Sequence, residues 1–281
     1  VCSLIERRSA HAVFGEFTRK FARAAAAAPF LADPAVTQCD PGAVVLPAPE
    51  DADVVAWAQN ETSTGAAAPV ERIGDGLVLI DATSAAGGMA ADISRTDAYY
   101  FAPQKNFSSD GGLWVAFCSP AALERAERIA TSGRWIPESL NLGVAASNSA
   151  RNQTLNTPAI ATLLLLEDQI GWLLDLGGID AAEERCRRMS DHLYGWAEAS
   201  SYATPFVTDP AHRSPVVATI DLAPGVEAAR VIAELRGNGI VDVDPYRALK
   251  RNQLRIGTYA SVDQADVEAL TACIDHIVER L

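Results

Sequence analysis

The stretch "DAYYFAPQKNF" at residues 97–107 joins a short, strand-like apolar run to a lysine, Lys105. Three other runs have the same character, with β-branched and aromatic residues in close succession: "DVVAWA" (53–58), "GLVLID" (76–81) and "LWVAFC" (113–118). Such runs are typical of strands buried on both faces of a mostly parallel sheet. Helix-like segments such as the alanine-rich residues 15–30 alternate with them, so this half of the chain predicts an α/β fold.

A different pattern begins near Pro158. A long helix is predicted behind Thr157 and Pro158, a capping residue followed by proline in the first turn, and a second helix is predicted at about 181–199. Four segments follow in the order strand, helix, strand, helix: 214–222, 225–239, 252–259 and 263–281. We therefore predict a large domain over residues 1–165, followed by linking helices and a smaller C-terminal α+β domain over residues 166–281.

Composition excludes several classes of function. The 281 residues are 49% hydrophobic, which argues for a globular protein, and the net charge of −13 argues against non-specific nucleic-acid binding. The longest apolar run, 155–166, is too short and too interrupted to span a membrane. Five scattered cysteines and four histidines show no metal-ligand spacing, so we expect no metal site and a reduced, cytoplasmic setting.

Polar groups follow three of the predicted strands. They are Asn60–Thr62, Asp81–Ser84 and Gln104–Lys105, and the carboxyl ends of neighbouring parallel strands meet at one edge of a sheet. Lysine is scarce, since only Lys20, Lys105 and Lys250 occur among 23 basic residues. A lysine amine can lose its proton and attack a carbonyl, which a guanidinium cannot do.

Lys105 and Asp81 together suit one cofactor. Pyridoxal phosphate needs a lysine for its aldehyde and a carboxylate that keeps its ring nitrogen protonated. On position alone, however, Lys105 could be a solvated surface residue and Asp81 a turn or N-cap residue. The residues by themselves leave both interpretations open.

Five motifs occur together in one order: "NETSTG" (60–65), "IDATSAAGG" (80–88), "DAYYFAPQKNF" (97–107), "QTLNTPAIATL" (153–163) and "QLRIGTY" (253–259). In sequence and spacing they resemble the phosphoserine aminotransferase family, most closely its actinobacterial branch. The resemblance extends from Val1 to Leu281. It implies the fold-type I architecture of pyridoxal-phosphate-dependent transferases.

The resemblance also implies roles for individual residues toward the cofactor. It implies Lys105 as the Schiff-base lysine, Asp81 as the partner of the ring nitrogen and Thr62 as the partner of the 3-hydroxyl. The implied contacts to the cofactor phosphate are Thr83 or Ser84, Gln104 and, from the neighbouring subunit of a homodimer with shared active sites, Asn156 and Thr157. Where many members stack a tryptophan on the ring, this chain offers Phe14 or Phe17, of which we prefer Phe17.

Substrate contacts are implied in the same way. Arg255 resembles the arginine that grips the substrate α-carboxylate. At the substrate phosphate, where the family often has a His-Arg pair, the nearest match is Tyr246–Arg247, with Arg251 as an alternative. Without the family, Thr62 and Ser84 could satisfy local backbone groups, Asn156–Thr157 could be a helix cap, and Arg255 could be an edge charge.

The implied reaction is reversible transamination between glutamate and 3-phosphohydroxypyruvate, giving 2-oxoglutarate and phosphoserine in serine biosynthesis. Phosphohydroxythreonine of pyridoxine biosynthesis is a second implied substrate. Alternatives are another fold-type I activity, such as alanine–glyoxylate transamination or cysteine desulfuration, and an inactive dimerisation module. Family members also have a stretch before the position of Val1 with a glycine-rich phosphate-binding loop, so we expect this chain alone to bind the cofactor poorly.

Overall fold

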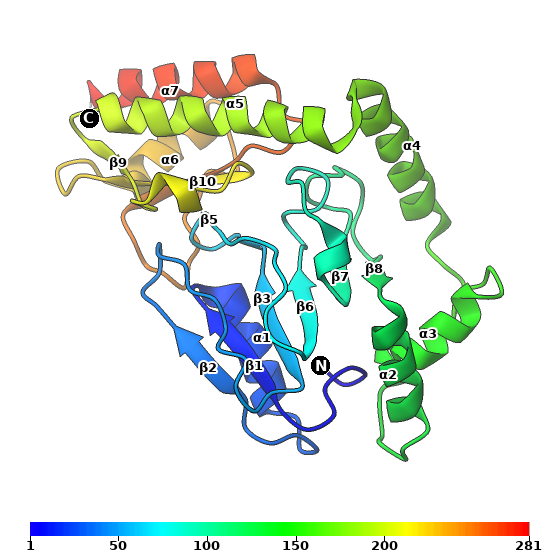
Figure 1. The fold of residues 1–281 in the computed structure, drawn as a ribbon. Coiled ribbons are helices and arrows are strands. Elements are labelled where there is room, and N and C mark those ends of the chain that lie inside the picture. Colours follow the sequence, from blue (N-terminus) through cyan, green and yellow to red (C-terminus); the bar gives the residue numbers. More distant parts are fainter. Residues whose placement is uncertain (281) are drawn as a thin grey trace.

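A six-stranded sheet forms the centre of the large domain. The computed structural model describes residues 1–280, and its main sheet has the strand order β2-β1-β3-β6-β7-β8 (Figure 1). The strands are β1 (Ser9–Val13), β2 (Ala35–Gln38), β3 (Val54–Ala58), β6 (Leu77–Asp81), β7 (Ala98–Phe101) and β8 (Val115–Cys118). Every neighbouring pair is parallel except β7 with β8, which confirms the predicted mostly parallel sheet.

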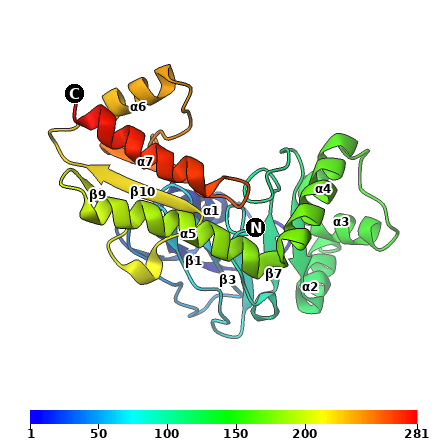
Figure 2. The same cartoon turned by 90° about the horizontal axis from the view of Figure 1, so that it is seen from above.

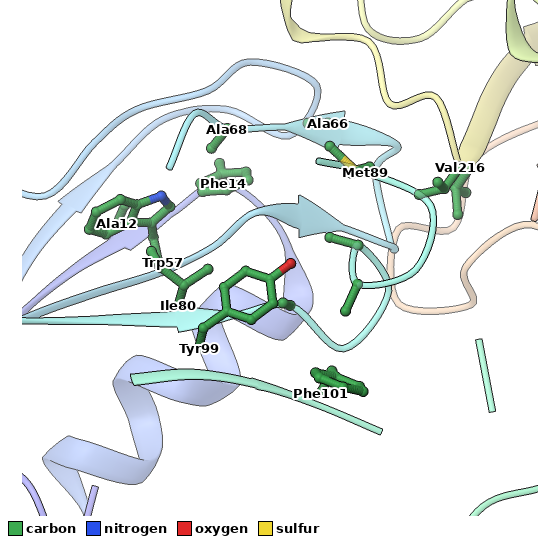
Figure 3. Close-up of a cluster of buried hydrophobic side chains, with 14 of the residues drawn as sticks. Ala12, Phe14, Trp57, Ala66, Ala68, Ile80, Met89, Tyr99, Phe101 and Val216 are labelled. Atoms are coloured by element: carbon green, nitrogen blue, oxygen red, sulfur yellow. The ribbon is translucent and has the colours of Figure 1, made fainter. Parts of the chain in front are cut away.

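Successive residues of β3 enter two different cores, one on each face of the sheet. Val54 and Ala56 pack with α1 (Glu16–Ala26) and α2 (Pro120–Ala130) on one face. Val55 and Trp57 lie on the other face, in a cluster with Phe14, Ile80 and Tyr99 (Figure 3). Full burial of each large apolar side chain contributes roughly 1.5–3 kcal/mol, which explains why β3 is apolar at every position.

Two strands of the six-stranded sheet were not predicted from the sequence, β1 and β2. The sequence of β1, "SAHAV", contains only alanine and valine as apolar residues, so its composition does not mark it as a strand. It nevertheless pairs with β2 on one side and with β3 on the other, and all five of its residues are buried. It is buried because it lies between two other strands of the sheet and not because of its composition.

Three helices lead from the large domain to the small one: α3 (Leu142–Ser149), α4 (Ile160–Leu176) and α5 (Gly178–Ala199). The predicted cap at Thr157 and the proline in the first turn are wrong, because the N-cap is Ala159, without a side-chain cap, and Pro158 precedes the helix. The junction between α4 and α5 is Gly177, whose φ of 119° belongs to the left-handed region that favours glycine. Because α5 follows at once, it begins three residues before the predicted start.

The C-terminal domain combines a small antiparallel sheet with three helices. Its strands have the order β11-β10-β9, with β9 (Ala203–Pro205), β10 (Val217–Leu222) and β11 (Gln253–Gly257). Its helices α6 (Ala228–Gly237) and α7 (Gln264–Val278) lie with α5 along the sheet, as Figure 2 shows from above. This arrangement matches the predicted α+β unit.

The two cores meet along α5. Ala182 and Cys186 in its first half belong to the large-domain core, whereas Met189 and Leu193 in its second half belong to the small-domain core. The predicted boundary after residue 165 falls within α4. We propose that α5 is the element that the two domains share.

A short hairpin, β4 (Asn60–Glu61) with β5 (Ala66–Ala67), also joins the domains. Gly65 at its turn has a φ of 68°, and its carbonyl accepts a 3.0 Å hydrogen bond from the backbone N–H of Ser214. A Cβ at this position would lie 2.8 Å from the carbonyl oxygen of Val217. Glycine is therefore required here both by the turn and by the close approach of the small domain.

Within residues 1–280, no helix is long and apolar enough to cross a membrane. The same described part of the chain contains no cluster of three or more His, Cys, Asp or Glu side chains arranged to hold a metal ion.

His11 is a buried titratable group in the middle of β1. Its Nε2 lies 2.9 Å from the hydroxyl of Ser9, its Nδ1 has no partner among the described residues, and its ring packs edge-on against Phe21 at 4.9 Å. Burial lowers the pKa of His11 from 6.5 to about 4, because the imidazolium would lose its hydration.

The protein should therefore lose stability in acid through His11. The pKa of His11 is 6.5 in the unfolded chain and about 4 in the folded protein. The contribution of neutral His11 to the free energy of unfolding is therefore complete above pH 6.5 and is lost as the pH falls toward 4. The shift corresponds to roughly 3 kcal/mol of unfolding free energy. Urea unfolding at about pH 7 and pH 4.5 should show a smaller loss in His11→Gln than in the wild type. Equal losses in the two proteins would contradict this assignment.

Candidate active site

Asp81 ends β6 at the carboxyl edge of the sheet. It pairs in register with Ala58 of β3 and with Tyr100 of β7. Its Oδ1 accepts hydrogen bonds from the backbone N–H of Thr83 at 2.9 Å and from the Thr83 hydroxyl at 2.6 Å. Burial, and next the neighbouring Asp81 carboxylate, raise the pKa of Tyr100. The carboxylate therefore has a defined orientation at the end of its strand.

Lys105 lies in the turn after β7 and is partly buried. Burial lowers the pKa of its ammonium group, and the positive charge of Arg255 on β11 lowers it further. Lys105 and Arg255 line the same cavity, of about 710 Å³, together with small-domain residues that include Gly257 and Tyr259. Two predicted site residues that are 150 positions apart in the chain thus line one cavity, and every other residue of its lining belongs to the small domain.

Asn106, which the sequence analysis did not single out, joins the Lys105 turn to the loop after β6. Its side chain is fully buried, and its Nδ2 donates a 2.8 Å hydrogen bond to the carbonyl oxygen of Ser84. Because this contact connects the loops that carry Lys105 and Asp81, it restrains the two groups relative to one another. Its position directly after the lysine in "PQKNF" is the sequence feature that could have identified Asn106 as part of the site.

Thr62 and Ser84 lie together in a buried network. The Ser84 hydroxyl accepts hydrogen bonds from the Thr62 hydroxyl at 2.7 Å and from the Asn60 Nδ2 at 2.8 Å. The Oδ1 of Asn60 is buried without a partner among the described residues. Gln104, in contrast, is exposed next to Lys105.

An aromatic and cationic cluster connects α1 with the loop before β11. The ring of Phe17 lies 5.4 Å from that of Tyr246, and the Arg255 guanidinium lies 5.7 Å from the centre of the same tyrosine ring. The Nζ of Lys20 donates a 3.3 Å hydrogen bond to the Tyr246 hydroxyl. Phe17, Tyr246 and Arg255, all named from the sequence, therefore form one group, which Lys20 joins.

The remaining predicted residues lie elsewhere or are engaged otherwise. Arg247 is exposed next to Tyr246. Arg251 is separate from the cluster, because its guanidinium pairs with Asp221 and lies over the ring of Phe206. Asn156 and Thr157 are exposed in the connection between α3 and α4. Both of these helices lie on the side of the molecule away from α1 (Figures 1 and 2).

Comparison with known proteins places this site in a family. The family model of the class-V aminotransferases matches residues 45–270. The chain is 59% identical over 282 residues to a protein of Mycobacterium sp. (strain KMS) that bears a phosphoserine aminotransferase name, covering 99% of this chain and 76% of the relative. It is 57% identical to the phosphoserine aminotransferase of Nocardioides sp., with the same coverage.

A solved structure has the same fold. The phosphoserine aminotransferase of Cytophaga hutchinsonii superposes with a TM-score of 0.89 at 22% identity, covering 98% of this chain and 78% of that chain. The chain belongs to the class-V aminotransferase family. Within that family it groups with the phosphoserine aminotransferases, which confirms the resemblance found in the sequence motifs.

Removing the positive charge of Arg255 should change the reactivity of Lys105. In Arg255→Met the pKa of Lys105 should rise toward 10.5, so that less of the amine is neutral at a pH below that value. Labelling with an amine-directed acylating reagent, followed by peptide mapping over a range of pH, should then be slower at Lys105 than in the wild type.

Arg251→Met is the matched control, because Arg251 is paired with Asp221 and is not among the groups that shift the pKa of Lys105. The Lys105 labelling profile of this variant should coincide with that of the wild type. A profile in Arg255→Met that also coincides with the wild type would show that the two charges do not interact.

Proposed function

We propose that this protein transfers the amino group of glutamate to 3-phosphohydroxypyruvate, giving phosphoserine and 2-oxoglutarate, and that it accepts the related phosphohydroxythreonine. The observation that carries the proposal is the cavity that Lys105, in the turn after β7, shares with Arg255 of the small domain. Asp81 ends β6, the strand that pairs with β7. The names borne by relatives that are 57–59% identical over nearly the whole chain support the same reaction.

We infer pyridoxal phosphate as the cofactor, because the donor set suits it. Lys105 offers an amine whose neutral form is favoured by its surroundings, and Asp81 offers a carboxylate oriented by Thr83. When bound, pyridoxal phosphate supplies an electron sink for negative charge at the substrate Cα. Phe17 would stack on its ring and Thr62 would bind its 3-hydroxyl, while Thr83, Ser84 and Gln104 are candidates for its phosphate.

The chain's own residues then divide the work of proton transfer and substrate binding. Lys105 moves the proton between the substrate Cα and the cofactor C4′, a role that requires an amine able to be neutral near neutral pH. Asp81 holds the proton on the ring nitrogen. Arg255 would bind the substrate α-carboxylate with its two-pronged guanidinium. Tyr246, whose ring centre lies 5.7 Å from the Arg255 guanidinium, and its sequence neighbour Arg247 are the candidates for the substrate phosphate.

We also propose a homodimer in which Asn156 and Thr157 of one subunit complete the site of the other. Both residues are exposed in the connection between α3 and α4. On the neighbouring helix α4, Leu164 and Leu174 are 60% and 67% exposed, an apolar surface of the kind that subunit contacts cover.

Lys105 should be the one lysine that reacts with the cofactor. Borohydride reduction of the cofactor-loaded protein should label only the peptide that contains Lys105, and Lys105→Arg should lose glutamate-dependent turnover of 3-phosphohydroxypyruvate completely, because a guanidinium cannot replace the amine. A label on Lys20 or Lys250 would disprove the assignment.

The same assay separates the rival activities. Glyoxylate with alanine as amino donor should be turned over far more slowly than 3-phosphohydroxypyruvate with glutamate. Preference for glyoxylate would indicate the alanine–glyoxylate type instead, and a folded protein that turns over neither pair even with saturating cofactor would indicate an interaction module.

Asp81→Asn should fold and retain much of its cofactor binding, yet slow proton transfer by about two orders of magnitude or more. The reason is that the ring nitrogen would lose the carboxylate that keeps it protonated. Single-turnover absorbance of the glutamate half-reaction measures this step directly. A near-normal rate would assign Asp81 a purely structural role.

A further inference from the structure

Glu61 is a fully buried carboxylate in the β4–β5 hairpin. Its Oε1 accepts hydrogen bonds from the backbone N–H groups of Phe17 at 3.3 Å and Ser63 at 3.1 Å, and from the Ser63 hydroxyl at 2.6 Å. Its Oε2 accepts from the backbone N–H and the hydroxyl of Thr18, at 2.8 and 2.9 Å. Both oxygens are therefore bound entirely by donors.

These contacts cap α1 from outside the helix. The first N–H groups of a helix have no partners within it. Here the backbone N–H of Glu16 donates to the Ser63 hydroxyl at 3.0 Å, and those of Phe17 and Thr18 donate to Glu61. A negative charge at this end also interacts favourably with the helix dipole. The start of α1 is thus occupied by the protein's own carboxylate and is not free to bind an anionic ligand.

Gly15 makes this approach possible. A Cβ at position 15 would lie 2.3 Å from Cγ and 2.4 Å from Cδ of Glu61, closer than real contacts allow. The backbone of Gly15 is extended, so the glycine is required by the space that Glu61 occupies and not by its own conformation. Glu61 and Gly15 form one fitted pair between the hairpin and the helix.

Two candidate cofactor contacts flank this pair. Phe17 is in the first turn of α1 and donates its N–H to Glu61, and Thr62 directly follows Glu61 in the hairpin. A shift of the helix start against the hairpin would change the separation of these two residues. We propose that Glu61 is a positioning residue that holds Phe17 and Thr62 at the spacing needed to bind the cofactor ring; this inference rests on the proposed function.

The test uses the full chain and compares two ligands: pyridoxamine phosphate, which contains the cofactor ring, and inorganic phosphate, which lacks it. In Glu61→Gln, one carboxylate oxygen is replaced by an amide NH2 group, which cannot accept hydrogen bonds from the backbone N–H groups. In Gly15→Ala, the added Cβ displaces the Glu61 carboxylate but leaves it charged. Both variants should bind pyridoxamine phosphate about tenfold more weakly, whereas inhibition of that binding by inorganic phosphate should be unchanged. Hydrogen exchange of the amides of residues 16–18 should become faster in both variants.

Asp97→Asn is the matched control. Asp97 is also buried and accepts hydrogen bonds from the backbone N–H of Val78 at 2.8 Å and from the Ser119 hydroxyl at 2.7 Å, but it precedes β7 at the opposite end of the strand from Lys105. This variant should lose stability and bind pyridoxamine phosphate as the wild type does.

The outcomes separate the inference from the function on which it rests. Wild-type affinity in folded Glu61→Gln, or equal weakening in Asp97→Asn, would overturn the positioning role while leaving the proposed function intact. Because weak binding is expected of this chain, titration extends to high ligand concentration, and a wild-type chain that does not bind pyridoxamine phosphate at any concentration would overturn both.

Discussion

The register of β3, β6 and β7 is the constraint on which the site depends. Ala58, Asp81 and Tyr100 lie opposite one another across these strands, and the strands are buried on both faces. A slip by one residue would exchange the two faces of a strand and place Trp57 or Ile80 in the wrong core. Apolar packing in the middle of the sheet thereby determines where the polar groups at its carboxyl edge stand, including Asp81 and the turn that carries Lys105.

Charge at the site is more balanced than in the whole chain. The net charge of the chain is −13, whereas Lys105 and Arg255 line one cavity together with Asp242 and Asp266. An anionic substrate group would therefore depend on direct pairing with a basic side chain and not on a general positive field. The positive charge of Arg255, after burial, lowers the pKa of Lys105, so the group proposed to bind the substrate carboxylate also favours the neutral amine that the proposed chemistry needs.

The β4–β5 hairpin connects the site to the rest of the molecule in two directions. Toward the large domain, Glu61 and Ser63 bind the first three N–H groups of α1. Toward the small domain, the Thr219 hydroxyl donates a 2.6 Å hydrogen bond to the carbonyl oxygen of Thr64, and Gly65 contacts the strand that begins at Val217. The hairpin thus contacts both α1, which carries Phe17, and β10 of the small domain. Because β10 pairs with β11, the strand that carries Arg255, the hairpin links the positions of Phe17 and Arg255.

Local sequence determined the apolar strands, most of the helices and the strand-end positions of Asp81 and Lys105. Buried strands and turns can be predicted in this way because each depends on the types of a few neighbouring residues. The resemblance of five sequence motifs to those of a known family then indicated the family to which the chain belongs. The tertiary structure decided what no local pattern contains. It placed β1 between two other strands of the sheet despite its small residues, brought Arg255 and Lys105 to one cavity, engaged Arg251 with Asp221, and filled the start of α1 with the carboxylate of Glu61. These features arise from contacts between residues far apart in the chain, and such contacts exist only once the chain has folded.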